Sequence, residues 1–321
     1  MKISIIGLGL IGGSIAQGLK NKHEMSVLDP DLNSLEAAKK IGFKVLENID
    51  EALESELIIV AAPTSVSEEI LKELSNKKFK NFVSDICSVK ASLQEVSKDL
   101  NYVGTHPMAG STKAGFTNAN PEIFKNAPWA VSVTPNTNNQ ALIAIVSIIN
   151  ELGAFVVPVD PIEHDESVVL SSHLAHVVAS AYAKSVGESE FAQLAQLLAG
   201  GSFRDLTRVT TSPAERTAEI VWPNRKSLSK VVENLSENLA KLQNLLEQGS
   251  QADIEKYLQS ASSLRTISDA TINKVKNHQG EKVAIKAITL KDEFLKNSQK
   301  RIIATDFVFE SENISYLINE I

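Results

Sequence analysis

The stretch KISIIGLGLIGGS, residues 2–14, decides how the first part of this chain folds. The isoleucine-rich KISII predicts a short buried strand, and the glycines that follow end it. Gly7, Gly9 and Gly12 then have the G-x-G-x-x-G spacing at the point where a helix is expected to begin. In such a turn the first glycine allows the chain to reverse, the second lets the backbone approach a pyrophosphate, and the third lets helix and strand pack closely. The stretch therefore predicts a dinucleotide-binding turn.

Asp29 ends the next predicted strand, MSVLD. A carboxylate at this place would accept hydrogen bonds from both hydroxyls of a ribose and would repel a 2′-phosphate, so NAD is favoured over NADP. The alternative is a glycine-rich turn followed by an aspartate that only caps a helix. The residues expected to bind the cofactor are Gly7, Leu8, Gly9, Leu10, Ile11, Gly12, Asp29 and Ser88, the last of which is discussed below.

Strand and helix patterns alternate from this turn to about residue 160. Predicted strands are LIIVAAP, NFVSDI, WAVSVTP and AFVVPV, and predicted helices are SLEAAKKIG, with Ser34 as its cap, VSEEILKELSNK and NQALIAIVSIINELG. Alternation at this spacing predicts an α/β fold with parallel strands and right-handed crossovers. We therefore expect a Rossmann-type, doubly wound parallel sheet over residues 1–160.

The pattern becomes helical over residues 161–279. Residues 162–186 are apolar on nearly all sides, which predicts a buried central helix. Two long amphipathic helices are expected at 224–249 and 251–276, and their exposed apolar faces favour an all-α dimerisation domain and a homodimer. Residues 280–321 mix a helical pattern, KAITLKDEFLKNSQK, with a possible strand, DFVFES, and form a tail of uncertain structure.

The composition narrows the class of protein. Apolar residues make up 43% and charged residues 22% of the chain, as in soluble globular proteins. The net charge of −7 argues against a nucleic-acid partner, which requires basic surface, although a local cationic pocket for a small acid remains compatible with it. No run of about 20 apolar residues predicts a membrane span. The single cysteine, Cys87, excludes an internal disulfide and favours a reducing, cytoplasmic compartment.

Two loops after later strands hold candidate catalytic residues, because ligands of open α/β sheets bind beyond the carboxyl ends of the strands. In SDICSVK, residues 84–90, Ser88 is placed to reach a nicotinamide or a substrate hydroxyl, and Lys90 to hold a phosphate. Alternatively, Asp85 and Ser88 form a capping pair for the next helix and Lys90 is solvated. THPMAGS, residues 105–111, places His106 beyond the following strand, where a neutral imidazole could accept a proton from an alcohol being oxidised. A structural histidine bound by backbone is the alternative.

The helical part holds candidate substrate ligands. SHLAH places His173 and His176 on one helix face, but no third ligand stands at a useful spacing, so no metal is expected and one histidine is expected to line the cleft between domains. In GGSFRDLTR, arginines beside glycines favour capture of a carboxylate by a bidentate guanidinium. A surface helix with an ion pair is the alternative. The candidate substrate ligands are His176, Gly201, Arg204, Asp205 and Arg208.

Together these motifs resemble the prephenate/arogenate dehydrogenases of tyrosine biosynthesis. The resemblance rests on GLGLIGGS, DICSVK, THPMAGS, SHLAH and GGSFRDLTR, in this order, and covers residues 1 to about 250. It implies an NAD-dependent oxidative decarboxylation of prephenate to 4-hydroxyphenylpyruvate. Hydride leaves the carbinol carbon for the nicotinamide, and carbon dioxide leaves as the ring becomes aromatic.

The resemblance also implies a role for each matching residue. His106 takes the proton of the ring hydroxyl, and Ser88 helps to position that hydroxyl and the nicotinamide. Arg208 holds the ring carboxylate, and His176 lies near the substrate side chain. Arg204 and Asp205 shape the same end of the pocket.

Three alternatives stay open at this point. Many relatives carry a tryptophan soon after the arginine motif, whereas Trp222 comes late here, so the choice between prephenate and arogenate is not decided. A β-hydroxyacid dehydrogenase or imine reductase would share the architecture, but those enzymes usually rely on a lysine that the helical part does not offer at the equivalent depth. A non-catalytic dinucleotide sensor would have no need for His106, Ser88 and Arg208 together.

Overall fold

The computed structural model describes residues 1–110, 113–277 and 279–320. The chain separates into two compact units, of which unit 1 comprises Met1–His164 and Ile272–Ile321 and unit 2 comprises Asp165–Thr271. Ser111, the last residue of the THPMAGS motif, lies outside the described residues.

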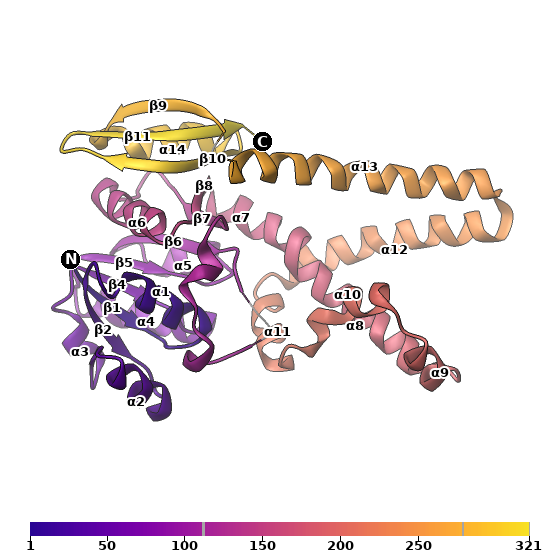
Figure 1. Ribbon diagram of the computed structural model, residues 1–321, viewed down its shortest axis with the longest axis horizontal. Helices are drawn as coiled ribbons and strands as arrows, with labels where there is room; N and C mark the ends of the chain where they lie inside the picture. The colour runs from indigo at the N-terminus through magenta and orange to yellow at the C-terminus, as the bar shows by residue number, and fades with distance from the viewer. Residues whose placement is uncertain (111–112, 278, 321) are drawn as a thin grey trace. The chain divides into compact units, whose positions relative to one another are not determined.

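Unit 1 is built on one mixed β-sheet (Figure 1). Within the described residues it has eleven strands in the order β3-β2-β1-β4-β5-β6-β7-β8-β10-β11-β9. All neighbours from β3 to β6 are parallel, whereas β7 runs antiparallel to β6 and parallel to β8. The strands of this first part are β1 (Lys2–Ile6), β2 (Glu24–Leu28), β3 (Lys44–Val45), β4 (Leu57–Val60), β5 (Phe82–Asp85), β6 (Asn101–Pro107), β7 (Pro128–Ser132) and β8 (Phe155–Val159).

Separate hydrophobic clusters cover the two faces of this sheet. In β1, Ile3 and Ile5 pack in one cluster with α1 and α6, while Ile6 packs in the other with α4 and α5. Side chains alternate between the faces of a strand, so β1, which is buried from Ile3 to Ile6, is covered on both sides, as expected for a short buried strand. The helices here are α1 (Leu10–Leu19), α2 (Leu32–Lys40), α3 (Ile49–Ala52), α4 (Thr64–Asn76), α5 (Ala91–Val96) and α6 (Asn139–Glu151), with 3₁₀ turns at Phe116–Asn118 and Pro121–Phe124.

The end of the chain belongs to the same unit and extends the same sheet. β9 (Glu281–Lys286), β10 (Ile302–Phe309) and β11 (Asn313–Glu320) are antiparallel to one another, and β10 joins β8 through the pair Ala304 and Val156. A 3₁₀ turn, Ala287–Thr289, leads into α14 (Leu290–Ser298). Phe294 of α14 lies edge-on to Phe307 and Tyr316 of the added strands, which attaches the helix to the sheet.

Unit 2 is helical. A helix that begins in unit 1 as α7 (Pro161–Val168) enters unit 2 at Asp165 and continues through a π-helical turn, Val169–His173, into α8 (Leu174–Gly187). α12 (Arg225–Gln248) and α13 (Gln251–Lys276) follow as a long helical hairpin, in which the hydroxyl of Tyr257 donates to the carbonyl of Asn238 at 3.4 Å (Figure 1). Shorter helices lie between them: α9 (Ala192–Leu197), α10 (Gly201–Thr207), a 3₁₀ turn at Arg208–Thr211, and α11 (Ala214–Val221).

Two local expectations are wrong. Ser34 does not cap α2; the carboxylate of Asp31 accepts the backbone N–H groups of Asn33 and Ser34, because the helix begins three residues earlier than its apolar pattern suggests. The helix expected at 162–186 is interrupted by the π turn and is not buried all round in the single chain, where Tyr182 is 38% exposed. Within the described residues no helix is long and apolar enough to cross a membrane.

Candidate active site

The glycine turn between β1 and α1 has a distinct steric reason at each glycine. Gly7 has φ +106°, and a Cβ there would lie 2.4 Å from the carbonyl oxygen of Ala61. A Cβ on Gly12 would lie 2.1 Å from the carbonyl oxygen of Gly7. A Cβ on Gly9 would meet no atom of the described residues within 4 Å, so their packing does not require glycine at this position. The open space at Gly9 is what close approach of a ligand to the backbone needs.

Asp29 follows β2 directly and is joined to the glycine turn. Its carboxylate accepts the backbone N–H of Leu8 and, at 2.8 Å, that of Asp31. These bonds hold the carboxylate beside the beginning of α1, which no side chain in the described part of the chain caps. The uncapped helix end offers backbone N–H groups to a phosphate, while the remaining lone pairs of Asp29 suit ribose hydroxyls.

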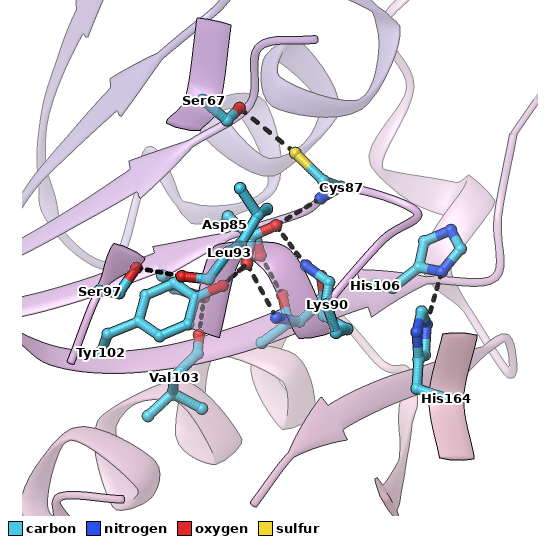
Figure 2. A network of polar contacts seen from close by, with 12 residues as sticks. Ser67, Asp85, Cys87, Lys90, Leu93, Ser97, Tyr102, Val103, His106 and His164 are labelled. Carbon is cyan, nitrogen blue, oxygen red and sulfur yellow. Dashed lines mark hydrogen bonds and ion pairs between the residues drawn. The ribbon is translucent and has the colours of Figure 1, made fainter. Parts of the chain in front are cut away.

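Asp85 lies at the end of β5 in a buried polar network (Figure 2). Its carboxylate accepts the Tyr102 hydroxyl at 2.6 Å and the Cys87 N–H at 2.7 Å, and it forms an ion pair with Lys90. The Lys90 ammonium also donates to the carbonyl of Thr105 at 2.7 Å, which is the residue before His106. Lys90 is 1% exposed, so it neither extends into solvent nor presents its charge at the surface. It ties the loop after β5 to the end of β6.

Ser88 and Cys87 lie in the loop that this network holds. Ser88 is half-buried at a bend between β5 and α5. The Cys87 thiol lies 3.2 Å from the hydroxyl of Ser67, and burial, together with the negative charge of Asp85, raises the pKa of Cys87 to about 12. A thiol with that pKa stays protonated near neutral pH, so Cys87 is a packing residue and not a nucleophile.

His106 lies one residue before the end of β6, within the strand and not beyond it as the sequence suggests. Its register partner on β7 is Ala130. The Nδ1 atom of His106 lies 3.0 Å from the Nε2 atom of His164, a buried residue of α7 (Figure 2). Because β1, β2, β5 and β6 run parallel, the glycine turn, Asp29, Ser88 and His106 are all at the carboxyl edge of the sheet.

Unit 2 carries a second group of candidate residues. Burial lowers the pKa of His176 on α8 below its usual value, and the positive charges of Arg216 and then Arg208 lower it further. Both charges therefore act on the His176 imidazole and favour its neutral form, and we name the three residues the cationic cluster (His176, Arg208 and Arg216). Such a cluster suits an anionic ligand.

The remaining residues of the GGSFRDLTR motif lie on the neighbouring helix. Gly200 is the N-cap of α10, whose residues include Gly201, Arg204 and Asp205, and Arg208 follows in the 3₁₀ turn. Arg204 and Arg208 are both exposed. Within the described residues no group of three or more His, Cys, Asp or Glu side chains is arranged to hold a metal ion.

Comparison with known proteins places both parts of the chain in one family. Residues 15–158 match the family model described as the nucleotide-binding domain of prephenate dehydrogenase, and residues 160–260 match the model of its dimerization domain. The chain belongs to the prephenate dehydrogenase family. The family confirms the predicted fold class, an α/β nucleotide-binding part followed by a helical part, and it makes the protein a dehydrogenase.

Relatives with known names agree with this assignment. The chain is 30% identical over 277 residues to the prephenate dehydrogenase of Lactococcus lactis, which covers 82% of this chain and 76% of that protein. A crystal structure of Synechocystis arogenate dehydrogenase is 25% identical, with a TM-score of 0.72, and covers 84% of this chain and 100% of that one. A crystal structure of the A. aeolicus prephenate dehydrogenase with hydroxyphenyl propionate and NAD+ has a TM-score of 0.75 at 24% identity. The match covers 83% of this chain and 97% of that one.

The sequence did not point to two residues that the structure adds to the candidate site, His164 beside His106 and Arg216 in the cationic cluster. His164 carries no motif of its own, although a histidine and an aspartate in a largely apolar stretch are an unusual pair at the start of a helix. Arg216 lies beyond the arginine motif, in AERTAEIV. A charged residue in such a helical pattern is usually an ordinary exposed residue, so it gave no signal of a site. Only the folded unit brings each of them near a predicted site residue.

Proposed function

We propose that this chain catalyses the NAD-dependent oxidative decarboxylation of prephenate to 4-hydroxyphenylpyruvate. The observation that carries the proposal is an imidazole, that of His106, at the sheet edge where the dinucleotide turn also lies. A base beside a hydride acceptor is what the oxidation of an alcohol requires.

The residues of unit 1 fit a dinucleotide. The open space at Gly9 admits a pyrophosphate, the uncapped beginning of α1 supplies N–H donors, and Asp29 favours NAD over NADP. Leu8, Leu10 and Ile11 complete the turn around it. When bound, NAD supplies the hydride acceptor.

The chemistry then needs a base and anchors for the substrate. His106 takes the proton of the ring hydroxyl while hydride leaves the ring carbon that carries this hydroxyl. Ser88 holds the hydroxyl in position for both transfers. The carbon–carbon bond between the ring and its carboxylate then breaks and carbon dioxide leaves. The electron pair of that bond stays with the ring and makes it aromatic. The phenolate oxygen so formed takes the proton back from His106.

The cationic cluster supports prephenate as the substrate. Prephenate has two carboxylates, and Arg208 and Arg216 supply two guanidinium groups within one unit. We assign Arg208 to the ring carboxylate and His176 to the pyruvyl side chain, with Gly201, Arg204 and Asp205 shaping that end. Arogenate, which forms tyrosine directly, is the alternative, supported by the likeness to the Synechocystis enzyme.

We further propose that the protein is a cytoplasmic homodimer joined through its helical unit. Its exposed apolar side chains support this, among them Phe191, Leu197 and Trp222. The name of the matching family model, a dimerization domain, also supports it. Sedimentation equilibrium that finds only monomers at micromolar concentration would contradict a stable dimer.

The test is NADH or NADPH formation by the purified protein with prephenate and, separately, with arogenate, each with NAD and with NADP. We expect turnover with prephenate and NAD. His106→Asn should lower kcat by about 10²- to 10⁴-fold, the usual contribution of a general base, while NAD affinity stays nearly unchanged. No turnover with either cyclohexadienol despite tight NAD binding would reject the proposed reaction.

A further inference from the structure

The contact between His106 and His164 involves the nitrogen that the proposed chemistry does not use. Nδ1 of His106 faces Nε2 of His164 at 3.0 Å, and the rings meet edge to face, with centroids 5.2 Å apart and planes at 68° (Figure 2). At that distance a single proton lies between the two nitrogens, and one ring donates while the other accepts. The direction of this bond sets the tautomer of both histidines.

His164 is held rigidly enough to set that direction. It is 2% exposed, in the first turn of α7, where its N–H donates to the carbonyl of Asp160 at 2.8 Å. The side chain of Asp160 also accepts the N–H groups of Ile162, at 2.8 Å, and Glu163, at 3.3 Å. A capped helix start and full burial keep the His164 ring in one orientation.

The proposed reaction allows only one direction. To act as the base through Nε2, His106 must leave that atom unprotonated, so its proton must be on Nδ1. The Nδ1–H then donates to Nε2 of His164. If His164 donated instead, His106 would carry its proton on Nε2 and could not accept one from the substrate.

We propose that His164 is a positioning residue, which accepts the Nδ1 proton of His106 and so presents Nε2 of His106 as the base. This inference rests on the proposed function. In the oxidation step the hydroxyl proton moves to Nε2 of His106, and the Nδ1 proton stays in its bond to His164. No proton passes to His164, and its lone pair stabilises the imidazolium while that charge lasts.

Kinetics of two substitutions test this role. His164→Leu removes the acceptor from a buried place, and His164→Gln keeps an amide oxygen near the position of Nε2. We expect His164→Leu to lower kcat by about 10- to 100-fold, the range for groups that orient a histidine through its second nitrogen, with little change in KM. His164→Gln should restore most of the loss.

A matched control separates this from a general effect of losing a histidine. His23 is also in unit 1 and hydrogen-bonds through its ring to Glu151 at 3.1 Å, outside the proposed site. His23→Leu should leave kcat unchanged. A kcat for His164→Leu equal to that of the unmodified protein, or an equal loss in His164→Gln and His164→Leu, would overturn the positioning role.

A measurement without turnover keeps the inference separate from the proposed function. Long-range ¹H–¹⁵N correlation of ¹⁵N-histidine-labelled protein resolves the tautomer of each imidazole, and His106→Asn identifies the His106 signals among the 6 histidines. We expect a protonated Nδ1 on His106 in the unmodified protein and a mixture of tautomers in His164→Leu.

A protonated Nε2 on neutral His106 would overturn the inference even if prephenate is turned over. Conversely, an inactive protein with the expected tautomer would reject the proposed reaction and leave the His164 contact as described. The tautomer measurement uses the unmodified protein, so it decides the question even if His164→Leu fails to fold.

Discussion

Replacing Lys90 by methionine tests whether the buried ion pair with Asp85 supports unit 1. Lys90 is 1% exposed and Asp85 0%, so neither charge can turn to solvent when the other is removed. Methionine has a similar length and is apolar, so the change removes the ammonium group while largely filling its space. The result should be a buried carboxylate without its counter-ion.

The structure indicates the size of the effect. Breaking a buried ion pair from one side costs about 3–5 kcal/mol. Asp85 keeps the Tyr102 hydroxyl at 2.6 Å and the N–H groups of Cys87 and Thr105 at 2.7 and 3.3 Å, which favours the lower end of that range. The lost bond from Lys90 to the Thr105 carbonyl adds about 1 kcal/mol. We therefore expect a loss of about 4 kcal/mol.

The assay is urea unfolding without nucleotide, read in unit 1 alone. Trp129 is buried in unit 1 and Trp222 is exposed in unit 2, so in a Trp222→Phe background the tryptophan fluorescence reports unit 1. Lys98→Met is the matched control, because Lys98 pairs with Glu95 at 3.2 Å on the surface. Exposed pairs contribute little to stability, and this variant should unfold at nearly the same urea concentration.

A loss of less than about 1 kcal/mol in the free energy of unfolding of unit 1 in Lys90→Met would refute this role of the buried ion pair. That result would mean that removing the Lys90 ammonium does not leave an uncompensated buried charge on Asp85. An equal loss of stability in Lys98→Met would also refute it, because the burial of the Lys90–Asp85 pair would then not explain the loss in Lys90→Met.

Three further predictions concern other residues of the candidate site. Gly12→Ala should destabilise unit 1 by about 1–3 kcal/mol or more, because its Cβ would meet backbone at 2.1 Å, whereas Gly9→Ala should keep thermal stability and weaken NAD binding in a titration. Arg208→Ala should raise the prephenate KM more than it lowers kcat in steady-state kinetics, and an unchanged KM would remove its role as the carboxylate anchor. The NMR titration midpoint of His176 should lie below the usual value of 6.5 and should rise in Arg216→Ala, since burial and positive charge lower its pKa. Because protonation is disfavoured in the folded state, the contribution of His176 to stability should be complete above pH 6.5 and be lost as the pH falls through its lowered pKa.

The sequence predicted the elements whose pattern is long enough to carry a signal. The helix expected at 251–276 is α13 with the same bounds, and the strand in KISII is β1. It did not predict β3, which has two residues, or α3, which has four, because so few positions carry no periodicity. In residues 280–321 the helical pattern and the possible strand overlap α14 and β10. The fold of this segment stayed uncertain because β9 and β10 are joined to the sheet by pairing with distant strands, which a local pattern does not show.

The sequence by itself determined the family, the glycine turn between β1 and α1 and most of the candidate residues. Glycine spacing, strand-to-helix alternation and short motifs are local properties of the chain, and the chemistry of the turn depends on them directly. Tertiary structure alone decided where charges and imidazoles meet. Lys90 reads as a solvated or phosphate-binding lysine until the fold places Asp85 and the Thr105 carbonyl around it. His164 reads as an ordinary helix residue until α7 brings it to His106, 58 residues away in the chain. Contacts of that sequence separation arise from the packing of whole elements, and no short pattern encodes them.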